Sequence, residues 1–194
     1  MLTLVEIARG VGGAVRLMKG DLSGLALLDR SREGFWRSFR PALLLAPIYA
    51  LHVFARYTEV TATASDEKIA LVETLRYSIE WTLFPVVLLE LSRLLDRTSR
   101  YIGAVVALNW ANIPLLIVPA ALLALARLVA PSLLEPLGLA IIVVTTVLVA
   151  RILKYTLEVS WVAAAVLAAL NLWLALTLDV GIVGILGLRI ADAT

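Results

Sequence analysis

Three ionisable residues that could do chemistry recur on one face of a predicted helix. Glu73, Arg76 and Glu80 follow each other at spacings of three and four residues, which places them on the same side of a helix. A charged side chain inside a membrane normally pairs with an opposite charge or faces a cavity. The pattern therefore fits two structures: an ion or proton path, or an interfacial helix whose solvated charges pair with one another.

Two amide side chains, Asn109 and Asn112, lie deep in a second apolar segment, close to Pro114. The proline has no backbone N–H to donate, so it leaves the carbonyl of Trp110 in need of another partner. An asparagine can supply that hydrogen bond or form one across helices. A kinked polar helix can also line a substrate site, and the sequence leaves both interpretations open.

Motifs for catalysis are missing from the sequence. The chain has no cysteine and a single histidine, His52, which argues against thiolate chemistry, iron–sulfur clusters and multi-histidine metal sites. It contains no HExxH or GxSxG motif and no glycine-rich phosphate-binding loop. We therefore expect a non-enzymatic protein with no catalytic residues, no cofactor, no metal and no nucleic-acid partner.

The composition is that of an integral membrane protein. Of the 194 residues, 61% are hydrophobic and 16% are charged, with a mean hydropathy of +0.95. Soluble domains are about 45–50% apolar and about 25% charged. A chain this apolar could not cover its surface with polar groups in water, so we expect the lipid bilayer to be its solvent.

The hydrophobic pattern predicts an all-α membrane protein, a bundle of about five transmembrane helices behind an N-terminal amphipathic interfacial helix. Residues 1–34 form the predicted cytoplasmic amphipathic segment and residues 35–194 the helical transmembrane domain. The second span is the weakest, because its first half is charged and its uncharged stretch is short. The predicted spans cover about residues 35–57, 66–93, 101–125, 137–155 and 159–178. An apolar tail, Gly181 to Leu188, remains and is shorter than the roughly 20 residues that a helix needs to cross.

The N-terminal segment has a helical period, with Arg9, Arg16 and Lys19 opposite an apolar face. Such a helix lies in a membrane interface or packs against the cytoplasmic end of its own bundle, and the pattern fits both. Other cations cluster at predicted helix ends, where they can snorkel, contact anionic lipids or dock a protein partner. These candidate docking residues are Arg37, Arg40, Arg93, Arg97, Arg151 and Lys154. Their alternation along the chain predicts a cytoplasmic N-terminus and a periplasmic C-terminus.

The layout resembles the bacterial form of the Yip-type membrane family, named after Ypt/Rab-interacting proteins. The stretch from Arg100 to Pro114, RYIGAVVALNWANIP, is most similar to that family, as is the aromatic entry at Phe35, Trp36 and Phe39. The resemblance covers residues 35–180. It implies a five-helix domain of the bacterial inner membrane without an established catalytic activity. The Rab-binding role of eukaryotic members is not carried over, because the N-terminus here lacks their long cytoplasmic arm.

Two functions follow from these observations. The first is a non-enzymatic inner-membrane protein that acts through helix–helix, partner-protein or lipid contacts, including anionic lipids, as a homo-oligomer or with a membrane protein partner. The alternative is a small transporter or channel that works as an oligomer. In that case the path would be lined by Asn109, Asn112, Glu73 and Glu80, with Arg76 on the same face.

Overall fold

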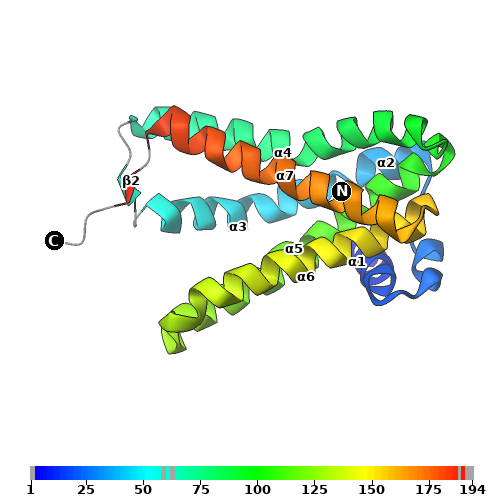
Figure 1. Cartoon of the computed structure of the whole chain (residues 1–194), viewed down its shortest axis with the longest axis horizontal. Helices are drawn as coiled ribbons and strands as arrows, with labels where there is room; N and C mark the ends of the chain where they lie inside the picture. Colours follow the sequence, from blue (N-terminus) through cyan, green and yellow to red (C-terminus); the bar gives the residue numbers. More distant parts are fainter. Residues whose placement is uncertain (1–2, 58–59, 62–63, 188, 191–194) are drawn as a thin grey trace.

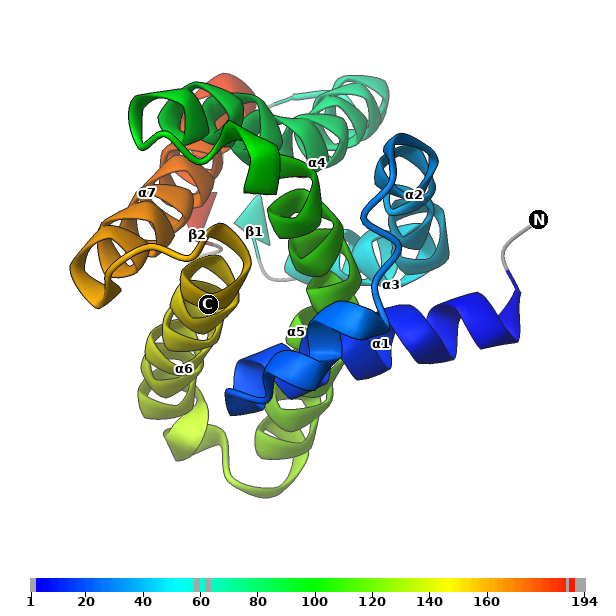
Figure 2. The ribbon, with the colours of Figure 1, turned by 90° about the vertical axis from the view of Figure 1, so that its right-hand side faces the viewer.

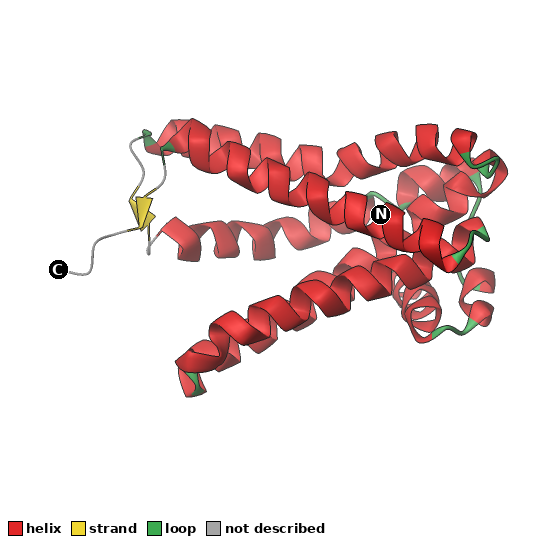
Figure 3. Cartoon of the chain, in the orientation of Figure 1, coloured by secondary structure: helices red, strands yellow, loops and turns green. Residues whose placement is uncertain are grey.

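The computed structural model describes residues 3–57, 60–61, 64–187 and 189–190, and almost all of them are helical (Figure 3). Two strands of two residues each, β1 (Val60–Thr61) and β2 (Arg189–Ile190), pair antiparallel. The helices are α1 (Leu4–Lys19), η1 (Leu22–Ala26), α2 (Arg32–Arg37), α3 (Arg40–Tyr57), α4 (Asp66–Leu94), η2 (Thr98–Arg100), α5 (Tyr101–Val129), η3 (Pro131–Leu133), α6 (Leu134–Leu157) and α7 (Trp161–Leu186). The predicted all-α fold class is confirmed.

The long helices form two groups that meet at one end of the molecule (Figure 1). Helices α3, α4 and α7 run together, and the hairpin of α5 and α6 diverges from them. We call the end where the two groups meet the packed end. It holds α1, η1, α2 and η2, together with the last turns of α4 and α6 and the first turns of α5 and α7. The opposite end, where α3 and α7 finish and α4 begins, is the far end.

Four helical stretches are long and apolar enough to cross a membrane, which makes the chain an integral membrane protein by its architecture. They are Arg32–Tyr57, Thr98–Val129, Pro131–Leu157 and Trp161–Leu186. Helix α4 has 29 residues, a length within the range of these four stretches, and it lies beside α7. It differs from them because the first half of α4 is charged. Large apolar side chains face outward along the bundle, as lipid contact requires.

Helix α1 packs on its own bundle, which is one of the two arrangements that its pattern allowed. It lies across α5 and α6 at the packed end (Figure 2). Ala14 and Leu17 are fully buried in one core with Trp110 and Ile152. The Arg151 guanidinium donates to the Met18 carbonyl at 2.9 Å, near the C-terminus of α1, where a cation also complements the helix dipole. The predicted segment 1–34 therefore shares a hydrophobic core with the transmembrane helices.

The first predicted span is interrupted between α2 and α3. Pro41 has no N–H to bond to the Arg37 carbonyl, so α2 ends there and a new helix begins. Ahead of α2, Ser31 accepts a hydrogen bond from the Gly34 N–H and caps the helix. Hydrogen bonding from Ser31, and then from the Arg37 guanidinium, holds the pKa of the Asp29 carboxyl below its ordinary value, against an opposing effect of burial.

The prediction that the last span ends near Leu178 and leaves a separate tail is wrong. Helix α7 continues through Asp179 to Leu186 and ends at Gly187, whose φ of 60° is the left-handed conformation that glycine adopts readily. The charge of Asp179 suggested an end because an unpaired carboxylate interrupts an apolar span. In the structure this carboxylate pairs with Arg56 of α3 and Arg76 of α4, so the helix can continue past it. Leu188 lies outside the described residues.

Candidate intramembrane site

Glu73 is a buried acid at the centre of a hydrogen-bonded group. Only 3% of its surface is exposed. Its Oε2 accepts a hydrogen bond from the Tyr49 hydroxyl at 2.7 Å, and its Oε1 accepts one from the Tyr57 hydroxyl at 2.9 Å. Both tyrosines belong to α3, so the acid of α4 holds these two helices together. Glu73 is therefore not solvated, although the predicted pairing with Arg76 on the same helix is present at 3.8 Å.

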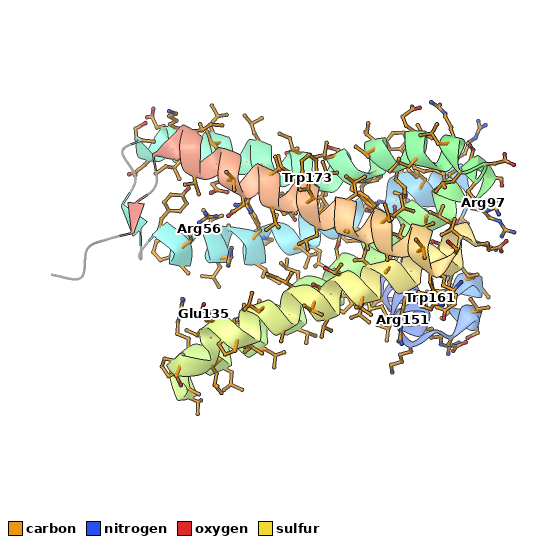
Figure 4. The ribbon with its side chains drawn as sticks, viewed as in Figure 1. Arg56, Arg97, Glu135, Arg151, Trp161 and Trp173 are labelled. Atoms are coloured by element: carbon orange, nitrogen blue, oxygen red, sulfur yellow. The ribbon has the colours of Figure 1, made fainter. Side chains whose placement is uncertain are left out.

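Arg76 connects α4 to α7 through several carboxylates. Its Nε lies 2.9 Å from Glu80, and its Nη1 lies 3.2 Å from the Oδ1 of Asp179 and 3.8 Å from Glu73. The same oxygen of Asp179 is 2.8 Å from Arg56 Nη1. Figure 4 shows Arg56 on α3, with its side chain in the region between α3 and α7. We call Arg56, Glu73, Arg76, Glu80 and Asp179 the charged cluster.

The sequence predicted three of the five members of this cluster. The spacing of Glu73, Arg76 and Glu80 places them on one helix face, whereas Arg56 and Asp179 lie near the ends of the predicted first and last spans and were not singled out. They are 123 positions apart, and no spacing rule joins residues on different helices. The available signal was one isolated cation and one isolated anion, each beside an apolar segment, since such charges usually pair within a membrane.

A cavity of about 330 Å³ lies next to the charged cluster and is lined by residues of α3, α4, α5, α6 and α7. Its lining is mostly apolar and aromatic. Four lining residues carry an amide or a carboxylate: Glu80, Asn109, Asn112 and Asn171. The cavity thus brings together the two groups of polar residues that the sequence singled out, because Glu80 belongs both to its wall and to the charged cluster.

The two predicted asparagines take different positions. Asn109 is buried and its Nδ2 donates to the Ser38 Oγ at 2.9 Å, which connects α5 to the break between α2 and α3. Asn112 is half-buried and lines the cavity one turn further along α5. Asn109 therefore provides both the polar contact within the bundle and part of the cavity wall. Asn171 on α7 also lines the cavity. It was not among the predicted residues, although it is likewise an amide within an apolar span.

Twelve of the 17 lysine and arginine residues lie at the packed end. They are Arg9, Arg16, Lys19, Arg30, Arg32, Arg37, Arg40, Arg93, Arg97, Arg100, Arg151 and Lys154. Several of the predicted docking cations are held by the protein itself. Arg37 pairs with Asp29, Arg40 lies 3.7 Å from Glu6, and Arg93 pairs with Glu90. Backbone carbonyls accept hydrogen bonds from three more of them, Arg97, Arg151 and Lys154. The remaining three, Arg9, Arg16 and Lys19, lie on the exposed face of α1.

Lys154 and Arg97 both reach the turn between α6 and α7. Lys154 donates to the Val159 carbonyl at 3.3 Å and lies 5.1 Å from the ring centre of Trp161. Arg97, labelled at the packed end in Figure 4, is turned toward the Glu158 carbonyl. Arg9, Arg16 and Lys19 remain exposed on α1, although Arg16 also donates to Ser23. The α1 cations are therefore an accessible part of the predicted docking face.

The fold and the site define a class: a helical integral membrane protein with a charged cluster and a polar cavity between its long helices. Within the described ranges, no group of three or more His, Cys, Asp or Glu side chains is arranged to hold a metal ion. Comparison with protein-family models, curated proteins and solved structures found no match to this chain.

Proposed function

We propose that the protein is a non-enzymatic membrane transport protein that binds a small molecule in the cavity between α3 and α7. The cavity itself carries the proposal, because it combines an apolar wall with a few converging polar groups, as small-molecule sites generally do. Its amide and carboxylate groups come from three helices, α4, α5 and α7, so the site lies between helices rather than within one. Assembly into an oligomer would bring several such cavities together.

Filling the cavity tests this function. Ala175 lines the cavity on α7, and Ala169 lies on the same helix, exposed and outside the cavity wall. We expect Ala175→Phe to abolish binding of small aromatic molecules that raise the melting temperature of the purified protein. Ala169→Phe is the matched control and should keep the full thermal shift.

The same variants then enter a flux measurement in liposomes, with the best-binding molecule as the solute. Replacing Glu80 or Asn112 by alanine should lower the flux, because both side chains line the cavity. Equal thermal shifts in the two phenylalanine variants would place the binding elsewhere, and unchanged flux in both alanine variants would remove these residues from the path.

The charge distribution supports an orientation for this function. Cytoplasmic ends of membrane helices carry an excess of lysine and arginine, and the packed end holds twelve of them. We infer that the packed end, with the N-terminus, faces the cytoplasm of a bacterial inner membrane, and that five helices including α4 cross. The C-terminus would then be periplasmic.

Single cysteines test this topology directly, because the chain has none of its own. Three exposed positions suit this test: Glu67 at the start of α4, Ser99 in η2 and Ser132 in η3. Ser99 lies in the connection between α4 and α5, and Ser132 in the connection between α5 and α6. We expect a membrane-impermeant maleimide to label Glu67→Cys and Ser132→Cys in intact cells and Ser99→Cys only after permeabilisation. Labelling of Glu67→Cys and Ser99→Cys from one side would show that α4 does not cross.

A second candidate function is contact with a partner protein or with anionic lipid, favoured by the exposed cations of α1. The resemblance to the Yip-type family supports it, because that resemblance implies a non-catalytic five-helix domain. The two functions predict that different residues are needed for activity. Replacing Arg9, Arg16 and Lys19 by glutamine would weaken co-purification with a partner or binding to anionic vesicles, and would leave ligand binding in the cavity unchanged.

A further inference from the structure

The charged cluster is one positive charge short. It contains three carboxylates, Glu73, Glu80 and Asp179, and two guanidiniums, Arg56 and Arg76. A net charge between apolar helices is costly where its groups are buried, as Glu73 is and as Glu80 and Arg76 partly are, unless a counter-charge or a proton compensates it.

Among the residues that the structure describes, no surrounding group supplies that charge. The other titratable side chains of these residues that face the cluster are Tyr49, His52 and Tyr57 on α3 and Tyr77 on α4. The tyrosines are neutral and His52 is uncharged in its ordinary form at pH 7. Lys68 on α4 donates instead to the Ile185 carbonyl, near the end of α7. The lining residues of α5 and α6 carry no ionisable group.

The excess negative charge falls on Glu80. Both oxygens of Glu73 accept hydrogen bonds from tyrosine hydroxyls, and the Oδ1 of Asp179 lies near two guanidiniums. In the part of the chain that the structure describes, the carboxylate of Glu80 has one charged partner, Arg76, which it shares with Asp179 and Glu73. Of the three acids, Glu80 is also the one that lines the cavity.

The rest of the cavity wall suits a cation with an apolar body. Tyr49, Tyr77, Trp81 and Phe84 line it, and the faces of aromatic rings attract cations. No lysine, arginine or histidine is among the lining residues. An anion would face the Glu80 carboxylate without a cation beside it in the wall.

We propose that the cavity binds a small organic monocation, which replaces a proton carried by the Glu80 carboxyl when the cavity is empty. This inference rests on the proposed function, since it takes the cavity as the binding site. When the cation enters, the carboxyl O–H bond breaks and the proton passes to the solvent, so that the charge of the site is the same before and after. A carrier built this way exchanges its cation for a proton moving in the opposite direction.

Two probe molecules of the same shape distinguish the contribution of charge to binding from the contribution of shape. Phenyltrimethylammonium and tert-butylbenzene differ only in the atom that bears the three methyl groups and in the charge. Their binding to the full chain in nanodiscs is measured calorimetrically, with empty nanodiscs as the blank. Repeating the cation titration in two buffers of different ionisation enthalpy counts the protons released.

We expect the cation to bind at least about tenfold more tightly than the hydrocarbon, a free-energy difference of about 1.4 kcal/mol, and to release about one proton. Glu80→Gln should lose the preference and the proton release while it still binds tert-butylbenzene, which also shows that the variant is folded. Glu90→Gln, on the same helix but exposed and outside the cavity, should behave as the native protein.

The outcomes separate this inference from the proposed function. Equal affinities for the two probes, a preference that survives in Glu80→Gln, or cation binding without proton release would overturn the cation–proton exchange and leave the cavity as a binding site. Binding of neither probe would contradict both proposals.

Discussion

Replacing Gly10 by alanine is expected to destabilise the protein by about 1–3 kcal/mol, the usual cost of forcing extra atoms into a packed core. A Cβ atom at this position would lie 2.2 Å from the ring of Trp110, which is buried and flanked by α1. The indole is held in the core, so α1 itself would have to move away from α5. The loss can be measured by thermal or denaturant unfolding in detergent.

Gly12→Ala is the matched control on the same helix. Its Cβ would meet a single atom, of the Leu27 side chain, at the ordinary contact distance of 3.8 Å. Alanine favours a helix over glycine by roughly 0.5–1 kcal/mol, so this variant should be as stable as the native protein or slightly more stable. Equal stabilities of the two variants would mean that α1 does not pack on Trp110 and lies instead in the membrane interface.

The packing of α1 shows which features of the fold the sequence could predict and which it could not. The period of α1 predicted a helix with one apolar face, but a period does not say whether that face meets lipid or protein. The same limit applies to the tight packing of Gly10, since the pattern of one helix contains no information about the side chain on its neighbour. The predicted start of the second span at residue 66 matches the start of α4, where Ser65 accepts a hydrogen bond from the Lys68 N–H and caps the helix.

The same limit applies to the prediction of the charged cluster. Glu73, Arg76 and Glu80 could be predicted to share a face because their spacing is local to one helix. Their connection to Asp179 could not, because it depends on how α7 lies against α4. Two errors of prediction have the same cause: the end of α7 was placed too early, and Asp179 was not recognised as a member of the charged cluster. In the sequence Asp179 is a single charge in an apolar stretch, because its partners, Arg56 and Arg76, lie on two other helices.

Replacing Arg76 by methionine is expected to cost about 1–3 kcal/mol, less than the roughly 3–5 kcal/mol for a fully buried ion pair, because the Asp179 side chain is 41% exposed. The change leaves Asp179 with Arg56 alone and removes the hydrogen bond that the Arg76 Nε donates to Glu80. Arg93→Met is the control, because Arg93 also pairs with a glutamate of α4 but both side chains are more than half exposed. Such a surface pair contributes about 0–1 kcal/mol.

A double replacement distinguishes lost charge from lost packing. If the cost of Arg76→Met is electrostatic, the variant Arg76→Met with Asp179→Asn should regain part of the stability, because neutralising Asp179 removes the carboxylate that lost one of its two guanidiniums. If the cost came from the arginine stem and its contacts, the second change would restore nothing. Unfolding measured for the native protein, both single variants and the double variant gives the coupling between Arg76 and Asp179. A coupling near zero would show that the cluster does not hold α4 and α7 together through its charges, and a large one would identify Asp179 as the acid whose compensation depends on this arginine.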